Sequence, residues 1–395
     1  MFLTHLSLTN FRAFSRLDMD MPRRILLLVG DNAQGKTSLL EAIYFFSTFS
    51  SIQSSADRQV INFLALEEPI PVCRMVAEIT RDDQQHQIEI RLILEPNGTS
   101  NGQRYRKEIL IDGIKRTSYQ AVGLFNAVIL LPFMTRIIEG GPEERRKYLN
   151  YALAQVVPGY AKALSEYAQS LSQRNALLKQ IAERNSDVSQ LEYWDSILAE
   201  KGSILLFHRM KAIQEIEHFA NQIHRSLTGD KEILQFSFQP ALGGNTNIHV
   251  KDILKQEPEN IKQLFLDSLK QKQKEEIMRG ITTIGPHRDE LRFIVNDLDM
   301  GDFGSRGQIR TTMLALKLAE LEWMKNQTGE KPVLLLDETL AELDHNRREQ
   351  LLKAISEGDQ TILTTTDLKL FNHNFSELAS VWHIHQGVIK QNNSD

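Results

Sequence analysis

The stretch Gly30-Asp-Asn-Ala-Gln-Gly35-Lys36-Thr37 decides the fold class, because it fits the pattern G-x-x-x-x-G-K-[ST] of a phosphate-binding loop. The apolar run 25–29 before it predicts a buried strand, and residues 38–44 after it predict a helix. Glycines let such a loop wrap a phosphate, so that backbone N–H groups and the helix N-terminus face the anion. Lys36 is then placed to reach the β- and γ-phosphates of ATP, and the Thr37 hydroxyl to ligate Mg²⁺. The residues expected to bind ATP here are Gly30, Asp31, Asn32, Ala33, Gln34, Gly35, Lys36, Thr37 and Ser38.

A second apolar run, 333–336, ends in the two carboxylates Asp337 and Glu338. Alone it is weak evidence, but beside a phosphate-binding loop it predicts the acidic half of an ATPase site. Asp337 is placed to hold Mg²⁺ through water, and Glu338 to orient or deprotonate the attacking water. We therefore expect Lys36, Asp337 and Glu338 to be the catalytic residues.

The two halves of this site lie 301 residues apart, from Lys36 to Asp337. Compact nucleotide kinases and small GTPases do not usually separate them so far, whereas SMC-like ABC-type ATPases do, because a helical arm interrupts their head. Apolar residues at helical spacing over 160–181 and 194–223, with a polar break at 185–189, predict an antiparallel helical hairpin. The pattern alone fits a plain helical subdomain equally well.

The expected fold class is α/β: an ABC-type ATPase head, with a mixed β-sheet and a P-loop helix, interrupted by a helical arm domain. Its expected parts are residues 1–133 and 281–395 for the head and 134–280 for the arm. Alternating runs predict strands at 3–9, 72–80 and 87–94, and apolar runs predict strands at 332–336 and 361–365. A turn at 96–98 and connecting structure at 243–244 and 251–260 complete the outline.

An ABC-type signature is expected shortly before the acidic strand, and Gly304-Ser305-Arg306-Gly307-Gln308 occupies that place. A helix predicted over 309–324 follows it directly, so Ser305 and Gly307 stand at a helix N-terminus, where anions bind. In the ABC arrangement this site caps the γ-phosphate bound by the other protomer. Asp344 matches a D-loop at the dimer seam, and Thr366 occupies the switch position that senses the γ-phosphate. The ATP-binding residues expected from these later segments are Ser305, Gly307, Gln308, Asp344 and Thr366.

Composition places limits on the function. The chain has 46 basic and 51 acidic residues among 395, a net charge of −5, so any DNA contact must use a local basic patch. One patch is a predicted hairpin from 104 to 116 with an Asp112-Gly113 turn, and another opens a helix at 145–147. Both also fit ordinary solvated faces or structural ion pairs. The candidate DNA contacts are Arg104, Arg106, Lys107, Arg145 and Arg146.

A single cysteine excludes a disulfide framework, and the lack of a long apolar run or secretory signal favours a cytoplasmic protein.

These motifs together resemble the RecF family of bacterial recombination mediators. The resemblance runs from about residue 3 to 385 and includes residues 6–12, 285–291, 315–320, 334–337, 342–344 and 364–367, with 144–149, 172–175 and 194–195 in the arm. It implies that Arg12 lies near the nucleotide phosphates. The chain departs from the family in three places: Arg306 stands where the signature usually has Gln, Glu338 replaces an aspartate, and 131–135 lacks two acidic residues. Arg306 fits either a contact to the shared γ-phosphate or a solvent-facing position.

The resemblance implies an ATP-dependent DNA-binding protein of recombinational repair that forms an ATP-induced homodimer. It further implies binding to duplex DNA and to junctions of duplex and single strand, and cooperation with RecO and RecR to load RecA at gaps. ATP and Mg²⁺ are the expected cofactors, and ATP hydrolysis is expected to be slow and to act as a switch. A transporter ATPase is disfavoured by the helical insertion and by the signature. An SMC-like nuclease is disfavoured because only 58 residues follow Asp337.

Overall fold

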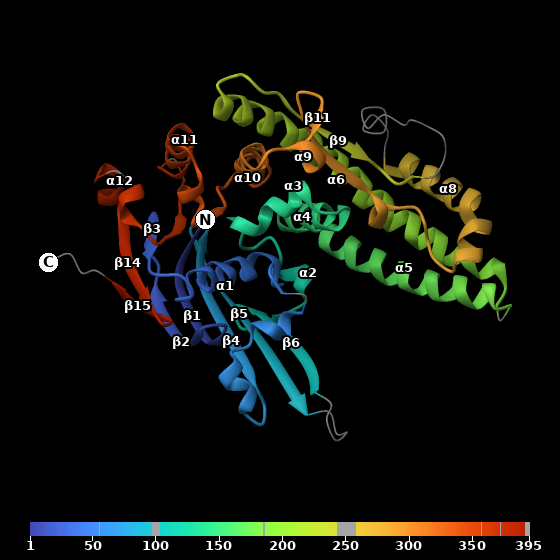
Figure 1. The fold of residues 1–395 in the computed structure, drawn as a ribbon. Coiled ribbons are helices and arrows are strands. Elements are labelled where there is room, and N and C mark those ends of the chain that lie inside the picture. The colour runs from blue at the N-terminus through green and yellow to red at the C-terminus, as the bar shows by residue number, and fades with distance from the viewer. Residues whose placement is uncertain are drawn as a thin grey trace. The chain divides into compact units, whose positions relative to one another are not determined.

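The computed structural model describes residues 1–54, 56–96, 103–184, 186–242, 258–356, 358–371 and 373–391. They form two compact units (Figure 1). The first comprises Met1–Met134 and Glu320–Asp395, and the second Thr135–Ala319. Pro96 of the predicted turn at 96–98 is described, as the end of a strand, whereas residues 97 and 98, the Gly243-Gly244 pair and most of the 251–260 stretch lie outside the described residues.

The first unit contains a six-stranded sheet in the order β15-β14-β3-β13-β12-β8. Its central strands are parallel and completely buried, namely β3 (Ile25–Val29), β13 (Thr361–Thr365), β12 (Val333–Asp337) and β8 (Ala127–Leu130). Burial on both faces explains why these strands are continuous apolar runs rather than alternating ones. β14 (Ala379–His385) lies parallel to β3, and β15 (Val388–Gln391) pairs antiparallel with β14. The strand order places β13 between the strand before the loop and the strand that ends in Asp337.

The second sheet of this unit is antiparallel, in the order β2-β1-β4-β5-β6-β7. The predicted alternating strands are confirmed as β1 (Phe2–Phe11), β4 (Val72–Arg81) and β5 (Gln84–Pro96). The basic hairpin is also confirmed: β6 (Gln103–Ile111) turns into β7 (Ile114–Arg116) through Asp112 and Gly113, with φ of 50° and 77°. Two successive positive φ values are typical of a type I′ hairpin turn. β2 (Phe14–Asp20) was not predicted.

The helices of the first unit begin with α1 (Lys36–Thr48), which follows β3 and packs against β12 and β8. Shorter helical segments fill the connections. They are η1 (Asp57–Val60), η2 (Phe63–Glu67), α2 (Ser118–Ala121), η3 (Pro132–Thr135, ending at the first residue of the second unit), η6 (Thr339–Glu342), α11 (His345–Ser356), η7 (Leu368–Leu370) and α12 (His373–Leu378).

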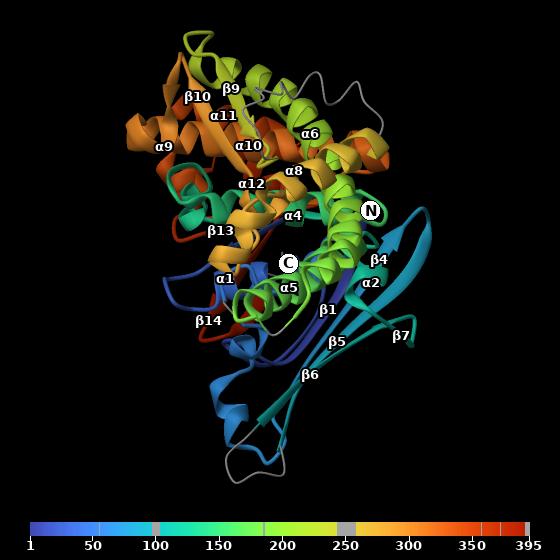
Figure 2. The same cartoon turned by 90° about the vertical axis from the view of Figure 1, so that its right-hand side faces the viewer.

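The second unit is built on a helical hairpin, which confirms the predicted antiparallel pair of helices (Figures 1 and 2). α5 (Tyr160–Ala182) and the 38-residue α6 (Leu191–Thr228) pack along each other. They run antiparallel, since Arg174 bonds Asp195 near one end and Tyr160 bonds Arg209 nearer the other. Both arginines are almost completely buried. Buried charges must be paired, so these contacts fix how the two helices align.

A third long helix, α8 (Pro258–Arg279), packs against α5 and α6 and was not predicted. Its buried apolar side chains are Ile261, Phe265 and Leu269, and charged and amide residues fill most of its other positions. The other elements are α3 (Arg136–Glu139), α4 (Pro142–Val156), η4 (Val188–Gln190), β9 (Leu234–Gln239), η5 (Pro286–Arg288), β10 (Glu290–Val295), β11 (Leu298–Asp299) and α9 (Met300–Phe303). α10 (Arg306–Thr328) begins in this unit, and its residues from Glu320 onward are counted with the first unit.

The sequence analysis placed residues 281–319 with the head, whereas the structure groups them with the arm. The reason is strand pairing: β10 joins β9 and β11 in a three-stranded sheet, and β9 packs on α6. The signature segment 304–308 therefore folds in the second unit.

Candidate functional site

The phosphate-binding loop connects the buried strand β3 to α1 through backbone positions that exclude side chains. A Cβ on Gly30 would lie 2.5 Å from the Ile384 carbonyl oxygen, and Gly35 has a φ of 107° that favours glycine. The Gly30 N–H donates to the Thr365 carbonyl at 3.2 Å, which ties the loop to the end of β13. The loop is thus held at the carboxyl edge of the parallel sheet, where ligands bind in open α/β sheets.

The Lys36 ammonium lies within the loop and is only 4% exposed. Its Nζ donates to the carbonyl oxygens of Gly30 and Asp31 at 2.6 and 2.8 Å, and it lies 2.9 Å from Glu338 Oε1. Three oxygens match the three N–H donors of an ammonium group. Lys36 and Glu338, 302 residues apart in the chain, are therefore in direct contact.

Asp337 receives hydroxyl donors from both sides. Thr37 Oγ1 donates to one carboxylate oxygen at 2.7 Å, and Thr364 Oγ1 donates to the other at 2.6 Å. The Asp337 side chain is buried, and among the described residues it has no cationic partner. A buried carboxylate beside a threonine hydroxyl is the hard-oxygen donor set that Mg²⁺ prefers, since this ion takes one or two protein oxygens and completes its shell with phosphate and water. The residues present therefore fit Mg²⁺.

Glu338 begins the turn after β12 in the left-handed backbone region, with φ of 46°. Its N–H is 3.2 Å from both the carbonyl and the hydroxyl oxygen of Thr364, which holds the strained residue in place. The side chain is 32% exposed. Strained backbone held by its surroundings is common at functional sites.

These groups line one pocket of about 320 Å³ within the first unit. The structure brings together eight of the predicted site residues there and adds Ala13 and Pro132. The predicted residues that line it are Asn32, Ala33, Gly35, Lys36, Thr37, Ser38, Asp337 and Glu338. Gln34 instead points to the last hairpin, where its side-chain oxygen accepts the Gln386 N–H at 2.6 Å.

Three other predicted residues, Arg12, Asp344 and Thr366, do not line this pocket. The Arg12 guanidinium bonds Glu41 of α1 at 2.9 Å and the Ser54 hydroxyl, so it braces the helix after the loop. Asp344 pairs with Arg347 at 3.1 Å, and Thr366 is exposed. The side chain of the switch strand that reaches Asp337 is Thr364, which the sequence analysis did not select.

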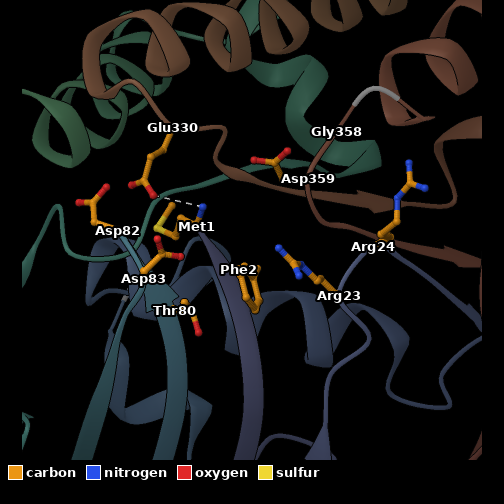
Figure 3. A pocket seen from close by; sticks show the side chains of 10 residues that line it. All are labelled: Met1, Phe2, Arg23, Arg24, Thr80, Asp82, Asp83, Glu330, Gly358 and Asp359. Atoms are coloured by element: carbon orange, nitrogen blue, oxygen red, sulfur yellow. Dashed lines mark ion pairs between the residues drawn. The ribbon is translucent and has the colours of Figure 1, made fainter.

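A larger pocket of about 670 Å³ lies at the opposite, amino-terminal edge of the sheet, beside the residues that precede β3 (Figure 3). Its carboxylates are partly neutralised: Glu330 lies 3.0 Å from Arg81 Nε and 3.3 Å from the Met1 amino group. The Arg23 guanidinium stacks 4.9 Å above the Phe2 ring. The described residues that line this pocket include neither a glycine-rich loop nor a lysine, so its size does not make it the nucleotide site.

The signature lies in the second unit, at the start of the 23-residue helix α10. Ser305 and Gln308 form a reciprocal cap: the Gln308 N–H donates to Ser305 Oγ at 3.3 Å, and the Ser305 N–H donates to Gln308 Oε1 at 3.1 Å. Ser305, Arg306 and Gly307 are exposed, and a Cβ on Gly307 would meet no atom within 4 Å. An open helix N-terminus of this kind can accept an anion.

The five basic candidates divide into two exposed arginines, two residues in structural ion pairs, and one partly buried arginine. Arg104 and Arg106 of β6 are exposed, with Arg106 also pairing Glu95 at 2.8 Å. Lys107 holds Asp57 at 2.7 Å, and Arg145, 7% exposed, bonds Glu290 at 2.8 Å. The fifth, Arg146, donates to the Asp289 carbonyl, and burial lowers the pKa of its guanidinium. Structural ion pairs thus account for Lys107 and Arg145.

Comparison with known proteins places the chain in a family. The family described as RecF/RecN/SMC N terminal domain matches residues 2–390. A DNA replication and repair protein RecF from Herpetosiphon aurantiacus is 35% identical over 398 residues, covering 98% of this chain and 99% of that protein. The RecF of Halalkalibacterium halodurans is 33% identical, covering 99% and 100%. This chain belongs to the RecF family. Both relatives are named DNA replication and repair protein RecF, and the matches cover 99% and 100% of their lengths.

Solved structures of RecF share the fold as well. The structure of the recombination mediator protein RecF-ATP in the RecFOR pathway matches with a TM-score of 0.83 at 28% identity, covering 98% of this chain and 97% of that chain. The RecF-ATPrS structure gives the same TM-score at 29% identity, covering 99% and 98%. An Smc head bound to the C-winged helix domain of ScpA, at 15% identity and a TM-score of 0.51, shares the fold alone. Among the described residues no helix is long and apolar enough to cross a membrane.

Proposed function

We propose that this RecF family member is an ATP-dependent DNA-binding switch, in which two copies close on two ATP molecules. The observation that carries the proposal is the assembly of Lys36, Thr37, Asp337 and Glu338 in one pocket from segments about 300 residues apart. The exposed Ser305 and Gly307 at the N-terminus of α10 supply the second contact surface, which would meet the γ-phosphate held by the other copy.

The surface around the signature supports such an interface. Three large apolar side chains on neighbouring segments are exposed: Ile233 by 50%, Leu298 by 54% and Phe303 by 72%. Phe303 ends α9 two residues before Ser305, and Leu298 pairs with the last residue of β10. Apolar side chains gathered at one place on a surface commonly mark a protein contact. A second copy of the chain would cover them.

In the proposed chemistry, Mg²⁺ held by Thr37 and Asp337 would neutralise charge on the β- and γ-phosphates. Lys36 would leave Glu338 and bind the phosphates. Glu338 would then be free to orient the attacking water and accept its proton. Slow turnover would make hydrolysis the step that opens the dimer.

We propose Arg104 and Arg106 on β6 as contacts to DNA phosphates, together with Arg146. Phosphate contacts are insensitive to sequence and weaken with salt, which suits a protein that binds duplex DNA and junctions of duplex and single strand. In the cell, this binding would direct RecR and RecO to gaps where RecA is loaded. Their part in the proposal rests on the RecF relatives.

The test uses the full-length Glu338→Gln variant in sedimentation velocity, with and without ATP and Mg²⁺ and then with a short duplex. We expect a monomer that becomes a dimer only with ATP and then retains the duplex. Lys36→Met should bind no ATP. Ser305→Arg should bind ATP as a monomer and fail to dimerise. A Ser305→Arg protein that still dimerises with ATP would contradict the use of the signature between copies.

A further inference from the structure

The signature glutamine is held by residues of the arm that the ATPase motifs do not include. Gln308 Nε2 donates to Glu232 Oε1 at 3.1 Å, and the second carboxylate oxygen of Glu232 lies 3.0 Å from His224 Nε2. His224 is completely buried in the last turns of α6, which packs against β9 (Figure 1). A continuous chain of contacts therefore runs from α6 through Glu232 to Gln308 and Ser305.

The chemistry of these groups fixes the orientation of the Gln308 amide. A carboxylate only accepts hydrogen bonds, so the NH₂ group of Gln308 must face Glu232. Its oxygen then faces the Ser305 N–H and accepts from it at 3.1 Å. If Glu232 were absent, the amide could turn over or leave the helix end, and one half of the cap on Ser305 would be lost. Glu232 therefore determines how Ser305 and the first turn of α10 are presented.

We propose that Glu232, held by His224, is a positioning residue for the signature, and that it sets the strength of the ATP-dependent dimer. The inference rests on the proposed function, because it requires that Ser305 bind nucleotide across the dimer. A closed dimer contains two signatures, so the binding free energy lost at one signature is lost twice from the stability of the dimer. We expect Glu232→Ala to weaken the ATP-dependent dimer about tenfold, the size expected when each signature loses part of one ordinary hydrogen bond.

The experiment measures the dimer dissociation constant by sedimentation velocity in full-length Glu338→Gln protein with ATP and Mg²⁺. Glu232→Ala and Glu232→Gln are compared with the matched control Asp230→Asn. Asp230 lies two residues away, is 72% exposed and pairs with Arg225, so its variant removes the same charge without touching Gln308. ATP affinity of dilute monomer, measured with a fluorescent nucleotide, and the melting temperature should be unchanged in the Glu232→Gln and Asp230→Asn variants.

A double-mutant cycle separates positioning from a general structural effect. If Glu232 acts through Gln308, then Glu232→Ala in a Gln308→Ala background should cost nothing further, whereas independent effects would add. Additive losses, or a Glu232→Ala dimer as tight as the parent while Ser305→Arg abolishes dimerisation, would overturn the inference and leave the proposed function intact. If the parent itself does not dimerise with ATP, the proposed function fails and the inference fails with it.

Discussion

Glu338→Gln should raise the affinity of the monomer for ATP, in addition to stopping hydrolysis. The Lys36 ammonium uses its three donors on Gly30 O, Asp31 O and Glu338 Oε1. To bind the phosphates it must give up at least one of these, and the 2.9 Å ion pair with Glu338 is the contact closest to the site of the incoming charge. The same carboxylate would also repel the γ-phosphate.

The size of the effect follows from this contact. At 2.9 Å and an effective dielectric constant of about 20, the Coulomb attraction is about 6 kcal/mol, an upper bound before desolvation and side-chain ordering are subtracted. Glu338 is 32% exposed, so the net contribution falls toward the roughly 1 kcal/mol measured for partly solvated pairs. Glutamine keeps the shape and removes the charge. We therefore expect ATP to bind about fivefold more tightly, since about 1.4 kcal/mol corresponds to tenfold.

The assay is titration of a fluorescent ATP analogue at low ionic strength in a Ser305→Arg background, which separates binding by the monomer from dimerisation. Asp230→Asn is the matched control, because Asp230 pairs with Arg225 at 2.8 Å rather than with Lys36 and is not among the predicted ATP-binding residues. The gain for Glu338→Gln should shrink as salt is added, because salt screens charges that are partly exposed. Equal or weaker binding by Glu338→Gln would refute the reasoning that Lys36 exchanges Glu338 for phosphate.

Three further predictions concern single side chains. Thr364→Val removes the hydroxyl that donates to Asp337 at 2.6 Å. We expect this variant to lower the unfolding free energy by about 1 kcal/mol and to raise the Mg²⁺ concentration needed for ATP binding, measured in a magnesium titration. Arg145→Ala leaves the half-buried carboxylate of Glu290 without its partner, so it should lower the unfolding free energy by about 3 kcal/mol in denaturant titrations. Arg106→Ala should change the unfolding free energy by less than about 0.5 kcal/mol and should weaken duplex binding instead. Burial lowers the pKa of His287 to about 4 in the folded protein. As the pH falls, the imidazole of the unfolded chain, which has its ordinary pKa, therefore binds a proton before that of the folded protein does. Stability should therefore be full above pH ~6.5 and fall by up to about 3 kcal/mol toward pH 4, and urea unfolding of His287→Gln should lack this part of the pH dependence.

The parts of the fold that could be predicted from sequence are those with a strong local signal. β3 and β13 have the expected bounds because they are short apolar runs buried on both faces, and α5 and α6 follow from long apolar stripes at helical spacing. α8 was missed because charged and amide residues, with ion pairs such as Lys272 with Glu275, fill most of its length. The grouping of 281–319 with the arm depends on pairing between β9 and β10, which are more than 50 residues apart and carry no mutual signal in one sequence.

Thr366 is the predicted switch residue, whereas Thr364 is the side chain of β13 that bonds Asp337, and the motif alone does not distinguish between them. Because β13 lies between β3 and β12, its last residues must face both halves of the site. Thr365 O accepts the Gly30 N–H, while Thr364 accepts the Glu338 N–H and donates to Asp337. The end of β13 is thus bonded to the loop and to both carboxylate residues at once. A γ-phosphate that moves Lys36 away from Glu338 would act on residues already bonded to this strand. We therefore expect nucleotide binding to affect Thr364 first, through the sheet rather than through an exposed side chain beyond it.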